Sequence, residues 1–128
     1  LLKECPSMRI ALDIHRDGIE RQDGTGLSPV VEIGGKKAAQ IMIINGCDDG
    51  TMNMPDYLKN LHFASNLQSK LETSYNGLTR PILFDYRFYN QDLTTGSLLI
   101  EVGSHGNSLE QVKYSGELIG KTLAKYFK

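Results

Sequence analysis

Short apolar runs alternate along the chain with two longer amphipathic segments, and this order limits the folds that the sequence can adopt. Apolar runs bounded by Gly, Pro and polar clusters are typical of buried strands, whereas apolar residues at three- and four-residue intervals indicate helices. Strands that alternate with amphipathic helices favour an α/β fold, a layered sheet flanked by helices. The chain has 128 residues, which is the size of one domain. We therefore expect a single α/β domain over residues 1–128.

The apolar runs are interpreted as strands. Arg9–Ile14 is mostly apolar and leads into a polar cluster, as a buried strand does when it ends at a surface cleft. Val30–Ile33 and a second run, Ala38–Ile44, lie on either side of a Gly-Gly pair and predict a hairpin. A short strand is expected at Pro81–Phe84, and the clearest strand is Ser97–Gly103.

Two segments predict helices. Pro55 suits the first turn of one helix, and Asn76-Gly77 is expected to end it because either residue tolerates a left-handed backbone. The second helix begins at a capping box, formed by Ser108 with Gln111 three residues later. The apolar stripe of the first helix comprises Leu58, Leu61, Ala64, Leu67 and Leu71. The expected buried face of the second helix comprises Leu109, Val112, Gly116, Ile119, Leu123 and Phe127.

Charge and cysteine content narrow the functional classes. The formal net charge is -1 and the basic residues are scattered, so we expect no nucleic-acid partner. No apolar run approaches the roughly 20 residues of a membrane span, and no signal-peptide pattern opens the chain. Cys5 and Cys47 are too few for a disulfide framework and have no CxxC spacing. Whether they pair is left open by the sequence.

Ionisable residues interrupt two of the expected strands near their C-terminal ends, where open α/β sheets tend to bind ligands. Asp13, His15 and Asp17 would share one face if the first strand continued that far. Glu101 is the only polar side chain between Leu98 and Val102. Burial of this carboxylate would raise its proton affinity, which suits a general acid or base. An ion pair between Glu101 and Arg16 or Arg80 is an equally consistent interpretation.

The histidines by themselves do not define a metal site. A catalytic zinc needs about three protein ligands, and the chain contains only His15, His62 and His105, without HExxH or HxH spacing. A lone histidine such as His15 is more often hydrogen-bonded at the edge of a core than a ligand. His62 is interpreted as a packing or surface residue, and His105 follows Glu101 closely enough to line the same cleft. No phosphate-binding loop or GxSxG elbow is present.

Several motifs together resemble one family. Ala11–Asp17 resembles the aspartate-x-histidine-arginine-aspartate motif of the stage II sporulation protein P family. Further segments resemble that family in the same order along the chain, at Gly34–Lys37, Gly77–Arg80, Tyr89–Leu93, Leu98–Gly103 and Asn107–Glu110. Several separate motifs in one order are far more specific than any one of them.

The resemblance implies a zinc-dependent N-acetylmuramoyl-L-alanine amidase that degrades cell-wall peptidoglycan during sporulation and engulfment, in a family also associated with endopeptidase activity. It matches His15 to a zinc ligand and Glu101 to the catalytic glutamate. Zinc would lower the pKa of its bound water to about 7, and Glu101 would accept the proton of that water. Arg16, Asp17 and Asn90 are expected to orient His15 or to bind substrate.

The resemblance also implies parts that this sequence lacks. The superfamily binds zinc through two histidines and a glutamate, and we expect the earlier histidine and the ligand glutamate upstream of Leu1. The fold is then a zinc amidase-like domain without its N-terminal strand and helix, inactive by itself. An extracytoplasmic location is expected, with a membrane anchor outside this chain and with a lytic transglycosylase and a membrane scaffold as partners.

Two alternatives stay open. The domain is either a non-catalytic module that binds peptidoglycan or its partners, or a metal-independent hydrolase that uses Asp13 and Glu101.

Overall fold

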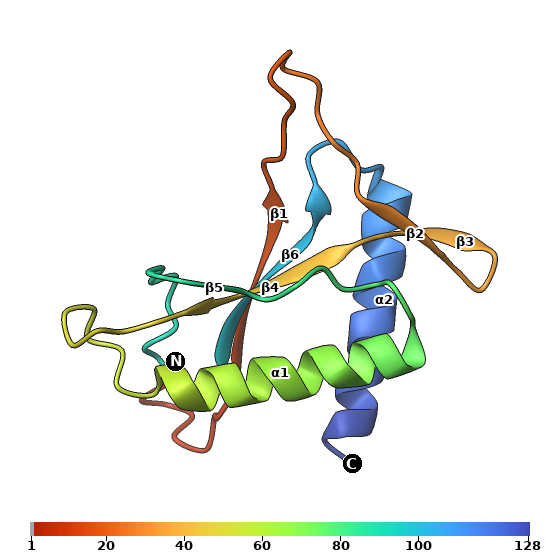
Figure 1. Ribbon diagram of the computed structural model, residues 1–128. Coiled ribbons are helices and arrows are strands. Elements are labelled where there is room, and N and C mark those ends of the chain that lie inside the picture. Colours follow the sequence, from red (N-terminus) through yellow and green to blue (C-terminus); the bar gives the residue numbers. More distant parts are fainter. Residues whose placement is uncertain (1) are drawn as a thin grey trace.

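A four-stranded sheet lies at the centre of the structure, a computed structural model that describes residues 2–128 (Figure 1). A two-stranded hairpin extends from it, and two helices complete the domain. In chain order the elements are β1 (Ala11–Asp17), β2 (Val30–Ile33), β3 (Lys36–Ala39), β4 (Ile41–Gly46), α1 (Tyr57–Ser74), β5 (Leu83–Asp85), β6 (Ser97–Ser104) and α2 (Leu109–Tyr126).

The central sheet is mixed, with the strand order β1-β6-β4-β5. Strand β6 pairs in parallel with β1 and antiparallel with β4, and β4 pairs in parallel with β5. All eight residues of β6 are buried, as expected for a strand that has neighbours on both sides. The order places β1 at one edge of the sheet, beside the most buried strand.

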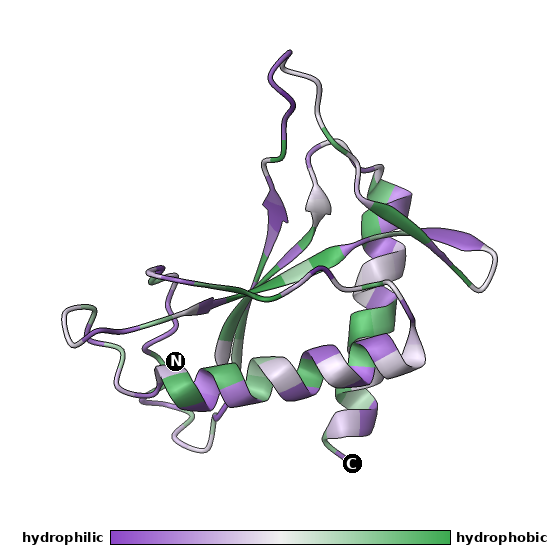
Figure 2. Ribbon diagram, viewed as in Figure 1, coloured by the Kyte–Doolittle hydropathy of each residue, from purple (hydrophilic) through white to green (hydrophobic). Residues whose placement is uncertain are grey.

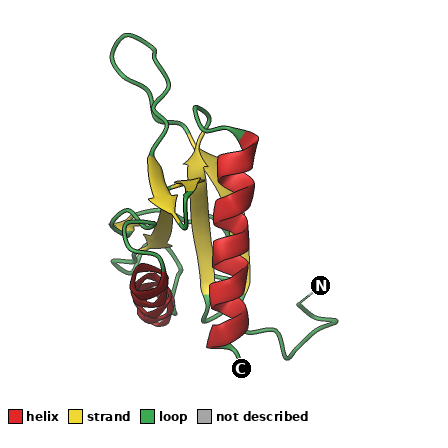
Figure 3. Ribbon diagram, turned by 90° about the vertical axis from the view of Figure 1, so that its right-hand side faces the viewer, coloured by secondary structure: helices red, strands yellow, loops and turns green. Residues whose placement is uncertain are grey.

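The hydrophobic core lies on the face of the sheet that both helices cover. Alternate residues of β6, Leu98, Ile100 and Val102, pack there with Ile41 and Ile43 of β4. The helices contribute Ala64, Leu67 and Leu71 from α1 and Leu118 and Ile119 from α2. Figure 3 shows the two helices crossing beside the sheet, and Figure 2 shows that β4 is hydrophobic whereas the loop after β1 is mostly hydrophilic. Among the described residues, the side chain of Glu101 lies on the opposite face of the sheet and is not part of this core cluster.

The predicted α/β class and several elements are confirmed, including the clear strand at Ser97, the turn at Gly34-Gly35 and the first strand, which continues to Asp17. The capping box is confirmed as well: the Ser108 hydroxyl accepts from the backbone N–H of Gln111, whose side chain accepts from the backbone N–H of Ser108. The prediction of one strand over Ala38–Ile44 was wrong. The chain changes sheets at Gln40, because β3 pairs with β2 whereas β4 pairs with β6 and β5.

The predicted helix faces were partly wrong. Leu58, Leu109 and Phe127 are more than half exposed, and Gly116 is also exposed. Polar residues take part of the buried faces: Asn60 on α1, and Ser115 and Thr122 on α2. Their burial is compensated by hydrogen bonds, such as that from the Ser115 hydroxyl to the carbonyl of Ala39 at 2.7 Å. Helix α1 begins at Tyr57, so the predicted place of Pro55 inside the first turn was also wrong.

Within residues 2–128, neither helix combines the length and the apolar character that crossing a membrane requires.

Candidate functional site

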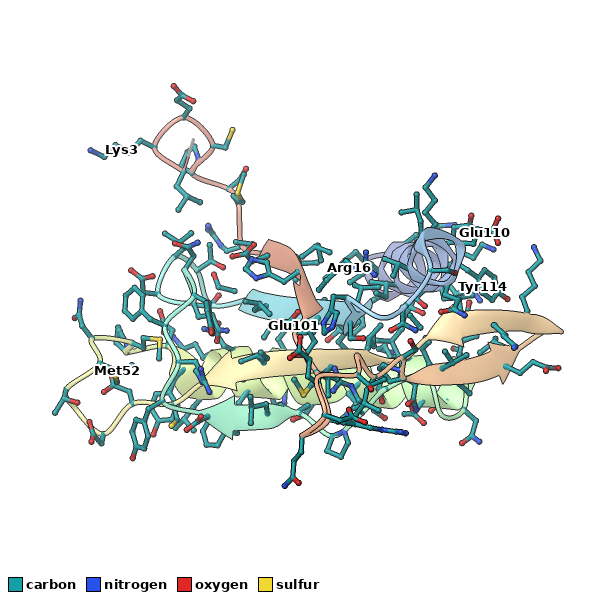
Figure 4. The ribbon with its side chains drawn as sticks, turned by 90° about the horizontal axis from the view of Figure 1, so that it is seen from above. Lys3, Arg16, Met52, Glu101, Glu110 and Tyr114 are labelled. Atoms are coloured by element: carbon teal, nitrogen blue, oxygen red, sulfur yellow. The ribbon has the colours of Figure 1, made fainter. Side chains whose placement is uncertain are left out.

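His15 and Glu101 occupy matching positions on neighbouring parallel strands. Their Cα atoms are register partners of β1 and β6, so both side chains project from the same face of the sheet. This is the face opposite the core, because the neighbours of Glu101 along β6, Ile100 and Val102, pack under the helices. In Figure 4 the structure is seen from above, with Glu101 over the middle of the sheet. The two residues that the sequence singled out therefore lie on one face.

Asp13 holds the imidazole of His15. The two residues are separated by one position on β1, so their side chains lie on the same face, and Nε2 of His15 is 2.9 Å from Oδ1 of Asp13. The side chains are 43% and 35% exposed, so the pair is accessible to a ligand. A carboxylate that binds one ring nitrogen fixes the orientation of the ring and leaves the other nitrogen, here Nδ1, to bind something else.

Glu101 is a buried carboxyl group without full hydrogen bonding. Glu101 is 9% exposed, and its Oε2 atom is buried with no hydrogen-bond partner among residues 2–128. Burial raises the pKa of Glu101 above its ordinary value, and the nearby carboxylate of Asp17 raises it further. The charges of His15 and Arg80 act in the opposite direction without reversing the shift. A carboxyl group whose pKa is raised in this way holds a proton more readily than an ordinary glutamate, which suits a general acid or base.

Arg80 pairs with Asp17 and not with Glu101. Its Nη2 atom is 2.9 Å from Oδ2 of Asp17, with both side chains largely buried. Among the described residues, neither Arg80 nor Arg16 forms an ion pair with Glu101, so the ion-pair interpretation of Glu101 was wrong. The Nε atom of Arg80 is buried and also has no hydrogen-bond partner within residues 2–128.

Arg16 contacts the loop between β6 and α2. Its guanidinium donates to the carbonyls of Ser104 at 2.7 Å and Asn107 at 2.6 Å, and it is directed toward the start of α2 (Figure 4). A register shift between His15 and Asp17 accompanies this arrangement. These contacts fix the loop and do not reach the ring of His15. Substrate binding by Arg16 stays a prediction.

The segment between β5 and β6 lies beside the pair of Asp13 and His15. The ring of Tyr89 meets that of His15 edge to face, with centroids 6.4 Å apart. A cavity of about 180 Å³ lies between this segment and β1, lined by Asp13, Asn90 and Leu93 among others. Asn90 lines this cavity, and its predicted role in orienting His15 or binding substrate stays a prediction. A larger groove, of about 550 Å³, lies away from these residues, between the hairpin and the start of α2.

The other histidines lie outside this cluster. His62 is exposed on α1 and contacts Asn66, in agreement with a surface role. His105, in the loop between β6 and α2, lies 3.6 Å from Glu20 and close to Gly26, so it packs against the loop after β1. Within residues 2–128 no three His, Cys, Asp or Glu side chains are grouped so that they can hold a metal ion. The donors described here therefore do not fit a complete zinc site, although His15 offers one nitrogen.

Tyr89 and Arg80 are parts of the site whose roles the sequence did not reveal. Arg80 was considered as a partner of Glu101 and as the end of the segment Gly77–Arg80, and Tyr89 appeared only within a segment resembling a family motif. For Tyr89, the sequence signal that could have revealed a role is its position next to Asn90 in that motif.

Comparison with known proteins agrees with the motifs around the site. The family model described as stage II sporulation protein P matches residues 1–124. The stage II sporulation protein P of Bacillus subtilis (strain 168) is 30% identical over 126 residues, which cover 94% of this chain and 29% of that protein. The chain thus spans less than a third of that relative. No solved structure matches. The chain belongs to the stage II sporulation protein P family.

Proposed function

We propose that this chain is part of a peptidoglycan hydrolase that cleaves the N-acetylmuramoyl-L-alanine amide bond during sporulation. Family membership supports the link to sporulation. The observation that carries the hydrolase proposal is the buried carboxyl group of Glu101, with one unpartnered oxygen, on the same face as the accessible imidazole of His15. An unpartnered buried carboxylate is costly for stability, and such groups are concentrated at functional sites.

Glu101 is the proton carrier in this proposal. Its raised pKa allows it to accept a proton from the attacking water as the water oxygen bonds to the lactyl carbonyl carbon. Glu101 then gives that proton to the alanine nitrogen as the carbon–nitrogen bond breaks. The products are a free lactyl carboxyl group and a stem peptide with a free amino terminus, and Glu101 returns to its starting state.

His15 is proposed as one zinc ligand, through Nδ1, with Asp13 orienting its ring from Nε2. Zinc, when bound, supplies polarisation of the amide carbonyl and of the water. The remaining ligands are proposed to lie outside residues 1–128, in a part that corresponds to the length of the relative that this chain does not match. The endopeptidase activity, the extracytoplasmic location and the lytic transglycosylase and scaffold partners belong to the same proposal.

The test replaces Glu101 by Gln in the full-length protein. We expect loss of muropeptide cleavage with unchanged zinc content, because the amide keeps the shape of the carboxyl group and cannot carry the proton. Glu32→Gln, at an exposed position of β2, is the matched control and should keep full activity. Cleavage by the Glu101→Gln protein at the rate of the unmodified protein rejects the proposal.

A non-catalytic binding module is the second candidate, favoured by the missing group of three metal donors within residues 2–128. Metal analysis of the full-length protein separates the two. About one zinc per chain supports the hydrolase, whereas peptidoglycan binding without zinc or cleavage supports the module. Cleavage that survives a strong chelator would instead indicate a metal-independent hydrolase that uses Asp13 and Glu101.

A further inference from the structure

The turn beside His15 has a strained backbone. Tyr89 and Asn90 are consecutive residues with positive φ, 37° and 58°. Asparagine tolerates this left-handed conformation, but a bulky residue such as tyrosine rarely adopts it. Such a conformation at tyrosine is strained and persists only where the surroundings fix it. Strained turns of this kind are concentrated at ligand-binding and catalytic sites.

Gln91 supplies the contacts that fix the turn. It is 1% exposed, its Oε1 accepts from the N–H of Gly46 at 2.6 Å, and its Nε2 donates to the carbonyl of Ile44 at 2.9 Å. Its own carbonyl accepts from the Asn60 side chain of α1 at 2.7 Å. Gln91 therefore joins the turn to both β4 and α1, and every polar atom of its side chain has a partner.

A glycine at position 46 allows the loop to lie this close to β4. A Cβ atom at Gly46 would collide with the backbone carbonyl oxygen of Arg87, so no larger residue fits without moving the loop. The segment from Arg87 to Gln91 is thus seated on the strand by a close backbone approach as well as by hydrogen bonds. The position of Tyr89 follows from this seating.

Tyr89 contacts the ring of His15 edge to face. The ring planes meet at 71° with centroids 6.4 Å apart, within the range that aromatic pairs prefer. Asp13 holds Nε2 at 2.9 Å, so the imidazole has one contact on its own strand and one on the loop.

We infer that Gln91 is a positioning residue: it fixes the strained turn that holds Tyr89 against His15, so that the imidazole is aligned between Asp13 and Tyr89. The consequence for hydrolysis rests on the proposed function. The alignment of the His15 ring is a property of this chain, and it can be measured without an activity assay.

The first test follows the Hε1 resonance of His15 by NMR at about pH 8, above the ordinary pKa of histidine. Tyr89→Leu removes the ring and should move this resonance, whereas Tyr89→Phe should leave it near its original position. Gln91→Met keeps the size of the side chain and removes its hydrogen bonds, so it should move the resonance as well. His62 and His105 serve as internal references. Gln40→Met is the matched control, because Gln40 donates to the carbonyl of Gly77 away from the turn.

The second test measures peptidoglycan cleavage by the full-length protein. Gln91→Met should lower kcat roughly tenfold with a smaller change in KM. This is the effect expected when the proposed zinc ligand His15 loses the contacts that align it. Gln40→Met, away from the turn, should keep the rate. If Gln91→Met does not fold, Gln91→Glu retains the acceptor for the N–H of Gly46 and takes its place.

An unchanged His15 resonance in the folded Gln91 variant overturns the inference, and so does an unchanged resonance in Tyr89→Leu. If the variants move the resonance of His15 but the unmodified full-length protein cleaves no peptidoglycan, the alignment of His15 is supported and the proposed function is rejected.

Discussion

Replacing Glu101 by Gln should make the folded chain more stable at neutral pH, although it removes the proposed proton carrier. Glu101 is 9% exposed and its Oε2 atom has no partner among residues 2–128, so the native state holds a poorly solvated charge when this group is ionised. An unsatisfied buried polar group costs about 1–3 kcal/mol, and more when it is charged. We therefore expect a gain of roughly 1–3 kcal/mol in the free energy of unfolding. For a domain of this size, 1 kcal/mol corresponds to roughly 3–6 °C in Tm.

The stability gain of Glu101→Gln should depend on pH. Burial raises the pKa of Glu101 in the folded state above that in the unfolded state, so the folded state binds the proton more tightly. The stability that this group contributes is present below its unfolded pKa, about 4.3, and is lost as pH rises through the folded pKa. The difference between the two proteins should thus be largest at neutral pH and shrink toward about pH 4.

Urea denaturation at several pH values measures the difference, with Glu32→Gln on the exposed side of β2 as the control. The reasoning is refuted if Glu101→Gln is less stable than the original chain at neutral pH, or if its gain is the same at all pH values.

Three further predictions concern other named contacts. Glu72→Ala should lower the free energy of unfolding by about 1–3 kcal/mol, because the Glu72 carboxylate accepts hydrogen bonds from Gly77 and Thr79. Burial raises the pKa of Glu72, but these hydrogen bonds outweigh burial and lower the pKa overall. The stability difference measured in urea melts should therefore disappear as pH falls through the lowered pKa. Ser108→Ala should destabilise the chain by about 1 kcal/mol through loss of the cap of α2, and an unchanged urea midpoint would contradict the capping role. Asp13→Asn in the full-length protein should weaken zinc binding roughly 10–100-fold in a chelator competition, and equal affinity would exclude a supporting role for Asp13.

Much of the fold was predictable because local signals coincide with the observed elements. The capping box at Ser108 and the apolar strand from Ser97 both depend on neighbouring residues, which the sequence displays directly. The change of sheet at Gln40 was not predictable, since an apolar run has the same appearance whether it pairs with one sheet or two. Polar residues such as Asn60 were missed as buried because their partners lie far along the chain: Asn60 binds Gln91 and Ser97.

The candidate site was predictable only in part. Alternation along a strand placed Asp13 and His15 on one face, and the structure shows them in contact. The pairing of β1 with β6, which brings Glu101 beside His15, depends on tertiary contacts that no local pattern contains. The same holds for Tyr89, whose position follows from the burial of Gln91 against β4.

His15 and Glu101 are proposed to act together in one reaction. The most direct measurement is the initial rate of peptidoglycan cleavage by the full-length protein with His15→Ala, with Glu101→Gln and with both substitutions. Residues that act as a unit show non-additive losses, so the double variant should be no slower than the more damaged single variant. Losses that multiply in the double variant, or a single variant with an unchanged rate, would contradict the claim.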